Sequence, residues 1–359
     1  MLLSYLLLVL SAVAGTLNVH VLDIGQGDSI LIQSPEGKVV LIDAGTGSIN
    51  VVPQLQSMNV TEINLLVATH AHADHIGGID DVINAFPVKV YLDNGMPHTT
   101  RTYNSLMKLI EDKNVTYISA KNGRQFNLGS EVTLEILHPQ DRLLRNTRSD
   151  LNSNSVVIRM LHGQNCFLFT GDAEEPTEHI LVQKGIEPCN VLKVAHHGSN
   201  HSSSQRFLQA VQPDIALISL GKNNRYNHPG EETVQRLEKI GSTIYRTDQH
   251  GTITLKSNGK DIEVSVAGKS PETFQPQKKS TVAIAPSPSS KDQDSTKFNI
   301  NTADAVQLQS IPGMGPKRSA AILDYRNQHG PFSSLDDLQN VSGIGPKTAA
   351  TISLYVFIE

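Results

Sequence analysis

Short apolar runs closed by glycine or aspartate make up most of the chain. Alternating apolar and polar positions over 17–23 predict a β-strand, and two more strands are expected before residue 43. A helix is predicted over 52–58. The run over 64–68 is almost wholly apolar, so both of its faces must be buried, as in a sheet covered on both sides. The pattern predicts a layered α/β sandwich that continues to about Val266.

The composition changes after this region. Residues 269–296 are rich in Pro, Ser, Lys and Gln, which is typical of a flexible linker. Residues 297–359 predict a compact helical segment with an internal near-repeat. Residues 311–322 are echoed by residues 341–352, and both copies contain Gly-x-Gly-Pro-Lys. We therefore expect one domain over 15–268, a linker, and a second domain over 297–359.

The first 14 residues are apolar but too short to cross a bilayer, and they end in Ala12-Val13-Ala14. This pattern predicts a signal peptide over 1–14 and a secreted or extracytoplasmic protein. No stable membrane association is expected once the signal is removed. No Lys or Arg precedes the apolar run, so an uncleaved anchor, or the end of a membrane segment in a longer protein, is the alternative.

Charge and cysteine content limit the possible functions. The 359 residues carry a formal net charge of -5, so no global positive field attracts nucleic acid, and any DNA contact must be local. The two cysteines, Cys166 and Cys189, are too few for a zinc finger. They either pair in an exported protein or are buried thiols, and the sequence leaves both possibilities open.

The strongest chemical signal follows the apolar run over 64–68. Four side chains that bind metals occur within six residues, and two glycines follow them at 77 and 78: His70, His72, Asp74 and His75. No helix or strand face can bury four such groups without partners, whereas a loop at a strand end can aim them at one point. His70 and His72 are expected to bind a first divalent ion, and Asp74 and His75 a second.

This motif resembles the metallo-β-lactamase superfamily. The order of motifs over 17–266 is similar to the hydrolase domain of ComEC-type competence proteins. The motifs are Leu-Asp-Ile-Gly-Gln-Gly-Asp-Ser at 22–29, Ile-Asp-Ala-Gly at 42–45, Phe-Thr-Gly-Asp-Ala at 169–173, His-His-Gly-Ser at 196–199 and Asn-His-Pro at 227–229. The resemblance implies an αββα sandwich that holds two divalent ions, Zn or Mn, and activates water for phosphodiester hydrolysis.

The resemblance also implies roles for residues later in the chain. Asp172 would bridge the two metals and, with Asp74, act in catalysis. His196 or its neighbour His197 would complete the second metal site, and we favour His196 as the ligand, with His197 as a hydrogen-bonding residue. His228 would bind the scissile phosphate or protonate the leaving oxygen. The alternative is that His228 caps a helix starting at Glu231.

One departure concerns the third histidine that many members supply to the first metal. The candidates are His138, expected at a strand end, and His162, expected in a polar turn. ComEC-type domains instead show Asn and Ser, which match Asn154 and Ser155 and are expected beside the ligands. The first site is then weaker or less selective, which leaves Zn and Mn both possible.

Other polar residues are expected to support the ligands. Asp43 ends a predicted strand and is expected to orient a ligand histidine. Asp28 is expected to act similarly, although Gly-Gln-Gly-Asp also fits a simple hairpin turn. Lys193 and Lys222 fit phosphate binding, but each is expected to be a surface charge.

Each Gly-x-Gly-Pro-Lys element predicts a tight hairpin whose free N–H groups suit a DNA phosphate. The duplicated element resembles the paired helix-hairpin-helix domain of ComEA-type DNA receptors, and contacts to the backbone imply sequence-independent, salt-sensitive binding. Joining packed helices is the alternative role of the hairpins. The predicted DNA-binding residues are Gly313, Gly315, Lys317, Arg318, Gly343, Gly345 and Lys347.

Three functions compete on these observations. The first is an exported metal-dependent nuclease that binds DNA through its C-terminal domain and hydrolyses it at a dinuclear site. The second is a hydrolase of another ester, such as a small phosphodiester, a lactone or a β-lactam. The third is a DNA receptor for uptake whose metal site is only structural. Structural zinc sites are closed and usually rich in cysteine, whereas this ligand set is open and has no cysteine, which argues against the third function. The DNA-binding module argues against the second function.

Overall fold

The computed structural model describes residues 15–275, 298–303, 305–309, 311, 314–353 and 355–358. The chain forms two compact units that divide between Ile284 and Ala285. The predicted signal peptide and residues 276–296 of the predicted linker lie outside the described residues.

Within the described part of the first unit, one sheet has nine strands in the order β16-β15-β14-β1-β2-β3-β4-β5-β6. Strands β3 to β6 run parallel, and the strands from β16 to β3 pair antiparallel. The strands are β1 (Leu17–Val21), β2 (Ile30–Gln33), β3 (Val39–Ile42), β4 (Leu65–Val67), β5 (Val90–Asp93), β6 (Thr116–Ser119), β14 (Ile253–Ser257), β15 (Ile262–Ser265) and β16 (Glu272–Phe274).

The other sheet of this unit has seven described strands in the order β13-β12-β11-β10-β9-β8-β7. Its strands β10 to β13 are parallel, and β7 to β10 are antiparallel. The strands are β7 (Gln125–Asn127), β8 (Val132–His138), β9 (Val157–His162), β10 (Asn165–Phe169), β11 (Val191–Lys193), β12 (Ile215–Ile218) and β13 (Thr243–Arg246).

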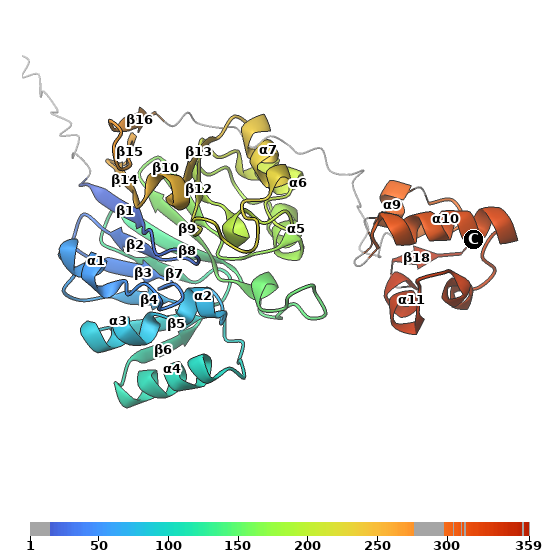
Figure 1. Ribbon diagram of the computed structural model, residues 1–359, viewed down its shortest axis with the longest axis horizontal. Helices are drawn as coiled ribbons and strands as arrows, with labels where there is room; N and C mark the ends of the chain where they lie inside the picture. The colour runs from blue at the N-terminus through green and yellow to red at the C-terminus, as the bar shows by residue number, and fades with distance from the viewer. Residues whose placement is uncertain are drawn as a thin grey trace, which may run out of the picture. The chain divides into compact units, whose positions relative to one another are not determined.

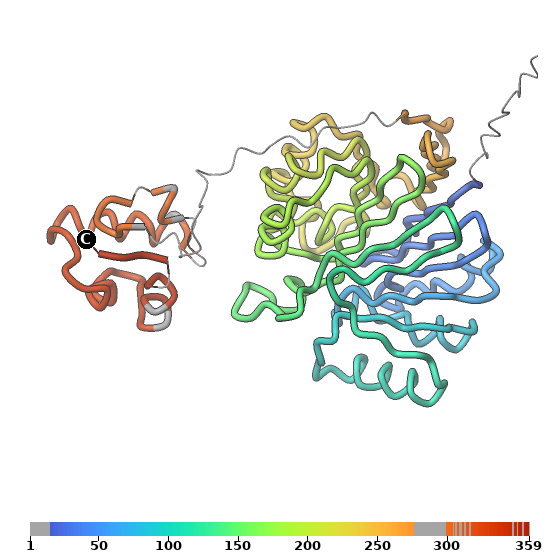
Figure 2. Tube along the Cα trace, turned by 180° about the vertical axis from the view of Figure 1, so that it is seen from behind, coloured from blue at the N-terminus to red at the C-terminus, as the bar shows by residue number. Residues whose placement is uncertain are grey.

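The two sheets pack face to face, and helices cover their outer faces (Figures 1 and 2). Val, Ile, Leu and Phe side chains from both sheets fill the space between them, in keeping with a chain that has no Trp. A second apolar layer lies under α1, α3 and α4, and a third lies under α5, α6 and α7. The helices are α1 (Val52–Ser57), α2 (Ala73–Ile76), α3 (Ile79–Ala85), α4 (Arg101–Asp112), α5 (Glu175–Gln183), α6 (Gln205–Val211), α7 (Glu231–Lys239), α8 (Thr247–His250), and the 3₁₀ turns η1 (Asn152–Asn154) and η2 (Ala195–Gly198).

The αββα sandwich expected from the apolar pattern and from the resemblance is confirmed. β4 is buried along its whole length, because α1 and α3 cover the face opposite to the second sheet. One predicted boundary was wrong. β16 lies inside the predicted linker and pairs with β15 of the first domain, so this domain extends beyond residue 268. The exposed strand Glu272–Phe274 lacks the apolar alternation of a buried strand, which explains why the sequence pattern missed it.

The structure joins Cys166 and Cys189 in a disulfide, with 4.7 Å between their Cα atoms. Cys166 lies in β10, and Cys189 comes just before β11, the parallel neighbour of β10. Strand pairing therefore brings together two residues that are 23 positions apart in the chain. Of the two alternatives that the sequence left open, the structure has the pair.

The second unit is helical, with a small parallel β-bridge. Its described elements surround one apolar core that includes Ile311, Ile322, Val341 and Ile352 from the two repeats. The elements are β17 (Phe298–Asn299), α9 (Ala305–Gln309), α10 (Pro316–His329), η3 (Leu335–Asn340), α11 (Pro346–Ser353) and β18 (Val356–Phe357). Among the described residues of both units, no helix has the length and apolar content needed to cross a membrane.

Candidate metal centre and nucleic-acid interface

The candidate ligands come from the carboxyl ends of parallel strands. The loop after β4 carries His70 and His72 and leads into α2, which carries Asp74 and His75. Asp172 follows β10, and η2 follows β11. β4 belongs to the nine-stranded sheet, whereas β10 and β11 are neighbours in the seven-stranded sheet. The site therefore forms where strand ends of the two packed sheets come together, and the fold gathers side chains that are far apart in sequence.

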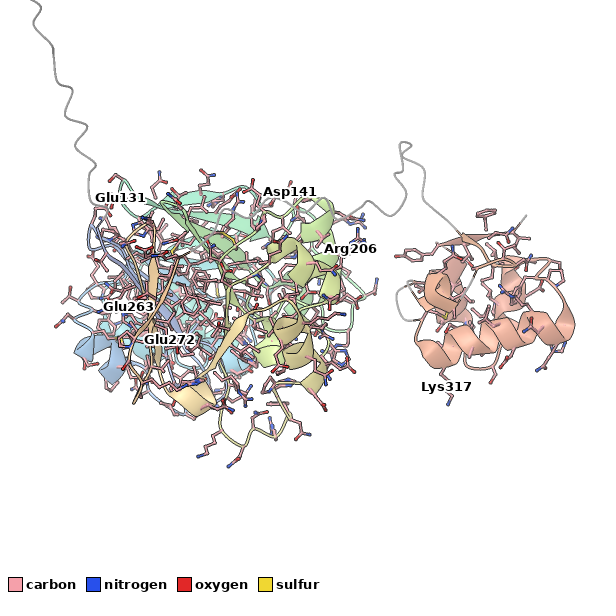
Figure 3. All side chains as sticks on the ribbon, turned by 90° about the horizontal axis from the view of Figure 1, so that it is seen from above. Glu131, Asp141, Arg206, Glu263, Glu272 and Lys317 are labelled. Carbon is pink, nitrogen blue, oxygen red and sulfur yellow. A yellow bond between two sulfur atoms is a disulfide. The ribbon has the colours of Figure 1, made fainter. Side chains whose placement is uncertain are left out.

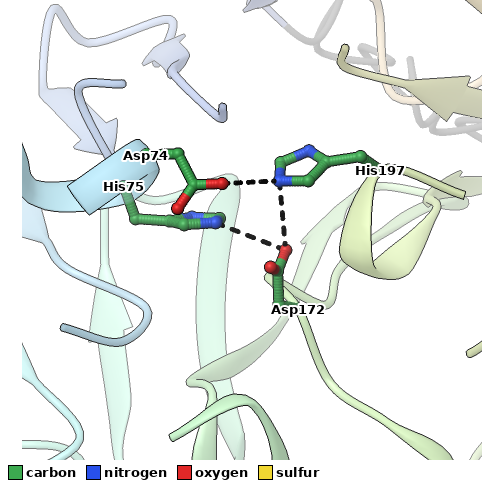
Figure 4. Close-up of side chains that lie close together, drawn as sticks. All are labelled: Asp74, His75, Asp172 and His197. Carbon is green, nitrogen blue, oxygen red and sulfur yellow. Dashed lines mark ion pairs between the residues drawn. The ribbon is translucent and has the colours of Figure 1, made fainter. Parts of the chain in front are cut away.

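Four of these side chains converge, and we call them the ligand group: Asp74, His75, Asp172 and His197 (Figure 4). One ligand atom from each lies within 4.8 Å of the other three. His75 Nε2 is 3.3 Å from Asp172 Oδ1, and His197 Nε2 is 3.4 Å from Asp74 Oδ2 and 3.6 Å from Asp172 Oδ1.

Three atoms in the ligand group are buried without a hydrogen-bond partner among the described residues: His75 Nε2, Asp172 Oδ1 and His197 Nε2. Leaving buried polar atoms unpaired is costly, so such atoms clustered at one point need an explanation. Imidazole nitrogens and carboxylate oxygens are the ligands that Zn²⁺ and Mn²⁺ accept. The residues present therefore fit a divalent cation at this point.

His70 and His72 form a second set on the other side of Asp172. His70 Nε2 lies 2.9 Å from His72 Nδ1 and 3.9 Å from Asp172 Oδ2. One oxygen of Asp172 thus faces the ligand group and the other faces His70, as expected for a residue that bridges two cations.

Neither candidate for a third histidine lies in this set. His138 ends β8, as expected, and its Nε2 donates to Ser153 O at 3.1 Å. His162 was expected in a polar turn, and that expectation was wrong. It is the buried last residue of β9, and its Nδ1 is 2.8 Å from Ser257 Oγ of the other sheet.

Asp43 lies directly behind His75. Asp43 Oδ2 is 2.8 Å from His75 Nδ1, so the other ring nitrogen of His75 faces the ligand group. Asp43 also accepts from the backbone N and the Oγ1 of Thr69, both at 2.7 Å. A carboxylate behind a ligand histidine fixes the ring and its tautomer. Thr69, which the sequence did not single out, holds that carboxylate in place.

Asp28 has the corresponding position behind His197. Its Oδ1 is 3.4 Å from His197 Nδ1, which also lies 2.9 Å from Ser219 O. Its Oδ2 accepts from Lys193 Nζ at 2.8 Å, and the lysine is fully buried. The expectation that Lys193 is a surface charge was therefore wrong. Lys193 ends a central strand, and only the pairing of β11 between β10 and β12 reveals that its side chain is enclosed.

The electrostatics of the site keep Asp28 and Asp172 ionised, whereas burial raises the pKa of Asp43. Burial acts to raise the pKa of Asp28, but Lys193 and His197 outweigh it and lower that pKa to about 2. Burial also acts to raise the pKa of Asp172, but His75 and His197 hold it well below its ordinary value. Ionised Asp172 is the form that binds cations.

His196 lies at the edge of the centre, outside the ligand group. Its Nε2 is 3.8 Å from Asp172 Oδ2, and its Nδ1 is 3.5 Å from Glu174 Oε1. His196 and His197 both have positive φ, and this backbone turns the His197 ring inward. The geometry thus favours His197 over the predicted His196 for the second metal.

Glu174 and Arg148 were missed by the sequence analysis. Glu174 is buried, and its Oε1 accepts from Arg148 at 2.6 Å and from Asn152 at 3.2 Å. Glu174 comes two residues after Asp172, and this closeness is the one signal that could have indicated it. Arg148 lies in an irregular loop and gave no sequence signal.

Asn154 and Ser155 differ in what they contact. Ser155 Oγ accepts from Asp172 N at 3.2 Å and lies 3.4 Å from His70 Nδ1, so it touches two candidate ligands. Asn154 instead bonds to the backbone of Leu144 and Asp150, and it braces its own loop.

His228 lies at the edge of the centre, with its ring centroid 5.7 Å from that of His196. Burial is the largest of the effects that lower its pKa to about 4. α7 starts at Glu231, as expected, but Gly230 is its N-cap and no side chain caps it, so the capping role is wrong. Lys222 is exposed, as expected.

In the second unit, the two repeats form the same local turns. Met314 N donates to Ile311 O, and Ile344 N donates to Val341 O at the equivalent position. Arg318 Nε donates to Gly343 O at 3.2 Å, so the first repeat contacts the second hairpin. Lys317 extends from the start of α10 (Figure 3). Gly315, Gly343 and Gly345 are exposed, whereas Gly313 and the Lys347 side chain lie outside the described residues.

The profile of the metallo-beta-lactamase superfamily matches residues 22–222. The chain belongs to this superfamily. A helix-hairpin-helix motif profile matches residues 293–356. The metallo-beta-lactamase fold thus carries the ligand group, and the helix-hairpin-helix repeats form the second unit.

Curated relatives of this superfamily domain include a competence protein, ComA of Neisseria gonorrhoeae, 33% identical over 241 residues that cover 66% of this chain and 31% of that protein. ComE operon protein 3 of Bacillus subtilis is 29% identical over 275 residues, which cover 70% of this chain and 34% of that protein. Recombination protein 2 of Haemophilus influenzae is 30% identical over 259 residues, covering 70% and 30%. This chain spans about a third of the length of these relatives. The metallo-beta-lactamase fold protein YhfI from Bacillus subtilis aligns with a TM-score of 0.46 at 12% identity, over 68% of this chain and all of that one.

Proposed function

We propose that the chain is an exported, metal-dependent nuclease. In this proposal the ligand group holds one divalent ion, and His70 and His72 hold another, with Asp172 between them. The cations are Zn²⁺ or Mn²⁺. The observation that carries the proposal is the convergence of the unpaired buried atoms of His75, Asp172 and His197 in a chain that also has a helix-hairpin-helix motif.

Two divalent ions, when bound, activate water and neutralise charge on a phosphoryl group. The chain's own residues prepare the site for this. Asp43 and Asp28 hold His75 and His197 with one ring nitrogen facing the centre. Asp74, partly exposed where the group opens to solvent, contributes to both binding and catalysis. His228 at the edge contacts the phosphate or the leaving oxygen.

The second unit binds DNA without sequence preference in this proposal, because hairpin N–H groups and Lys317 meet the phosphate backbone. Two observations support export. The residues 1–14 have a signal-like pattern, and Cys166 and Cys189 form a disulfide, a bond that persists in oxidising compartments. After removal of the signal, no stable membrane association is proposed.

The test is cleavage of plasmid and single-stranded DNA with added Mn²⁺ or Zn²⁺. It compares the whole chain, Asp74→Ala, and a chain shortened to end after Gln275, so that β16 is kept. We expect metal-dependent cleavage that falls by at least about tenfold in Asp74→Ala, because even loss of a residue that supports a metal ligand costs that much, and that is weakened by the shortening. DNA binding without cleavage under either metal would refute the nuclease and favour a DNA receptor or another ester substrate.

A further inference from the structure

An exposed aromatic side chain lies beside the metal centre. Tyr226, on the loop between β12 and α7, is 48% exposed. Its ring stacks on His228 with centroids 5.8 Å apart and planes inclined by 22°. His228 is next to His196, whose Nε2 is 3.8 Å from Asp172. Three rings therefore lead from solvent to the candidate bridging carboxylate.

A guanidinium accompanies this ring. Arg225 Cζ lies 5.0 Å from the Tyr226 centroid, and Arg225 donates to the Tyr226 hydroxyl at 2.8 Å. The pKa of Arg225 is raised, first by this hydrogen bond and, more weakly, by the charge of Asp74. Arg225 is exposed, and the contacts described for its guanidinium are those with Tyr226.

The loop that carries both residues has a fixed shape. Asn224 donates to Gly221 O and His228 O, and its Oδ1 accepts from the backbone N of Tyr226 and His228. Gly221 N donates to Gln26 of another loop at 3.2 Å. The exposed ring is thus held in place beside the centre by its own backbone.

Tyr226 differs from Tyr117, another exposed tyrosine of the first unit. Tyr117 stacks on the buried Tyr91 and donates to Asp93 at 2.9 Å, so its ring already has packing and hydrogen-bond partners in the neighbouring strand. Tyr226 contacts only its loop neighbours among the ring contacts described. A single exposed ring is common at a protein surface, so what sets Tyr226 apart is its position beside the metal centre, next to His228 and Arg225.

Nucleobases are the partners that fit a Tyr–Arg pair next to a phosphodiester centre. Planar bases stack on aromatic rings and on guanidinium groups, and such stacking is sequence-tolerant. In a duplex the bases stack on one another, so only an unpaired base can reach an aromatic side chain.

We propose that Tyr226 and Arg225 form a stacking platform for one nucleobase, which makes single-stranded DNA the preferred substrate of the metal centre. The base takes the position over Tyr226 that Arg225 occupies, and the displaced guanidinium pairs with a phosphate. This inference rests on the proposed nuclease for the site's chemistry, but the stacking itself can be measured without hydrolysis.

The absence of Trp from the sequence allows a direct measurement of stacking. Tyr226→Trp in the full chain supplies a single indole, and short oligothymidylate is added in the presence of a chelator. Stacking quenches the fluorescence. The control is Leu161→Trp, also at an exposed apolar position, but at the far end of β9 from Ser155. Quenching at 226 and not at 161 supports the platform, and equal quenching at both sites, or none at 226, overturns it.

A substrate cycle then tests strand preference. We expect Tyr226→Leu to lower the ratio of kcat/KM for single-stranded over duplex DNA by about tenfold, through KM, because stacking one base is worth about that factor. Tyr226→Phe, which keeps the ring, should restore the ratio. A single-stranded substrate that lacks the base beside the scissile phosphate should be cleaved by the native chain with a kcat/KM lowered by the same factor. For Tyr226→Leu, the missing base should lower kcat/KM no further. If the losses from the substitution and from the missing base instead add, Tyr226 and that base do not contact each other, and the platform is contradicted.

The two proposals fail in different ways. Quenching at 226 without any hydrolysis refutes the nuclease and keeps the platform. Hydrolysis whose strand preference is unchanged in Tyr226→Leu refutes the platform and keeps the nuclease.

Discussion

At the residue scale, Lys193 and Asp28 form a fully buried ion pair next to the metal centre. Removing one member of a buried pair leaves the other charge uncompensated, which costs about 3–5 kcal/mol. We expect Asp28→Asn to lower the free energy of unfolding by that amount, measured by urea denaturation with a chelator present. The double variant Asp28→Leu/Lys193→Met removes both charges and should recover most of the loss. An unchanged midpoint in Asp28→Asn would contradict the pairing.

His138 gives the protein a pH dependence that is separate from the metal centre. Burial lowers its pKa to about 4, from an ordinary value of 6.5. Because the folded-state pKa is depressed, the stability is fully present above pH 6.5 and is lost as the pH falls toward 4, up to about 3 kcal/mol. We expect His138→Gln, whose amide can still donate to Ser153 O, to lose less stability than the native chain across this window. If the free energy of unfolding changes with pH in the same way in the native chain and in His138→Gln, His138 does not titrate as inferred.

At the element scale, the loop between β1 and β2 packs against α2. Gly27 has φ +127°, and a Cβ there would collide with the carbonyl oxygen of Asp74, which also accepts from Asp28 N. Gly27→Ala should therefore displace Asp74 and reduce the metal bound per chain, measured by elemental analysis after dialysis. Gly37 also has a positive φ, but a Cβ there meets nothing within 4 Å. Gly37→Ala thus controls for backbone strain alone, and equal metal loss in both variants would contradict the steric argument.

A helix or strand can be predicted from the sequence when its burial imposes an apolar pattern on its residues. The run over 64–68 predicted a central strand because both faces of β4 are covered. β16 was missed because an exposed edge strand needs no apolar pattern. The turn after β11 was located correctly, but its positive φ values, which select His197 for the centre, depend on packing that no local pattern encodes.

At the scale of the whole molecule, the second unit should account for the salt dependence of DNA binding. A Lys317→Ala variant removes one exposed charge at the start of α10, and each phosphate contact adds about 0.9 to the slope of log affinity against log salt. We expect the slope measured by fluorescence anisotropy to become shallower by about one unit. Lys113→Ala changes an exposed lysine at the end of α4 and should leave the slope as it was. If Lys317→Ala and Lys113→Ala have the same slope, Lys317 does not contact the DNA phosphates.

The sequence by itself determined the sandwich, the helix-hairpin-helix repeats and the loop His70–His75, because strand burial, duplication and clustered ligands all leave local patterns. The resemblance already indicated Asp172, but only the tertiary structure decided between His196 and His197 and showed where Lys193 lies. Lys193 turned from an expected surface charge into a buried partner of Asp28, and His197 rather than His196 entered the ligand group. Both outcomes depend on strand order and on which way a backbone turn points a side chain. Those quantities are set by contacts between segments that are distant in the chain, so neighbouring residues do not reveal them.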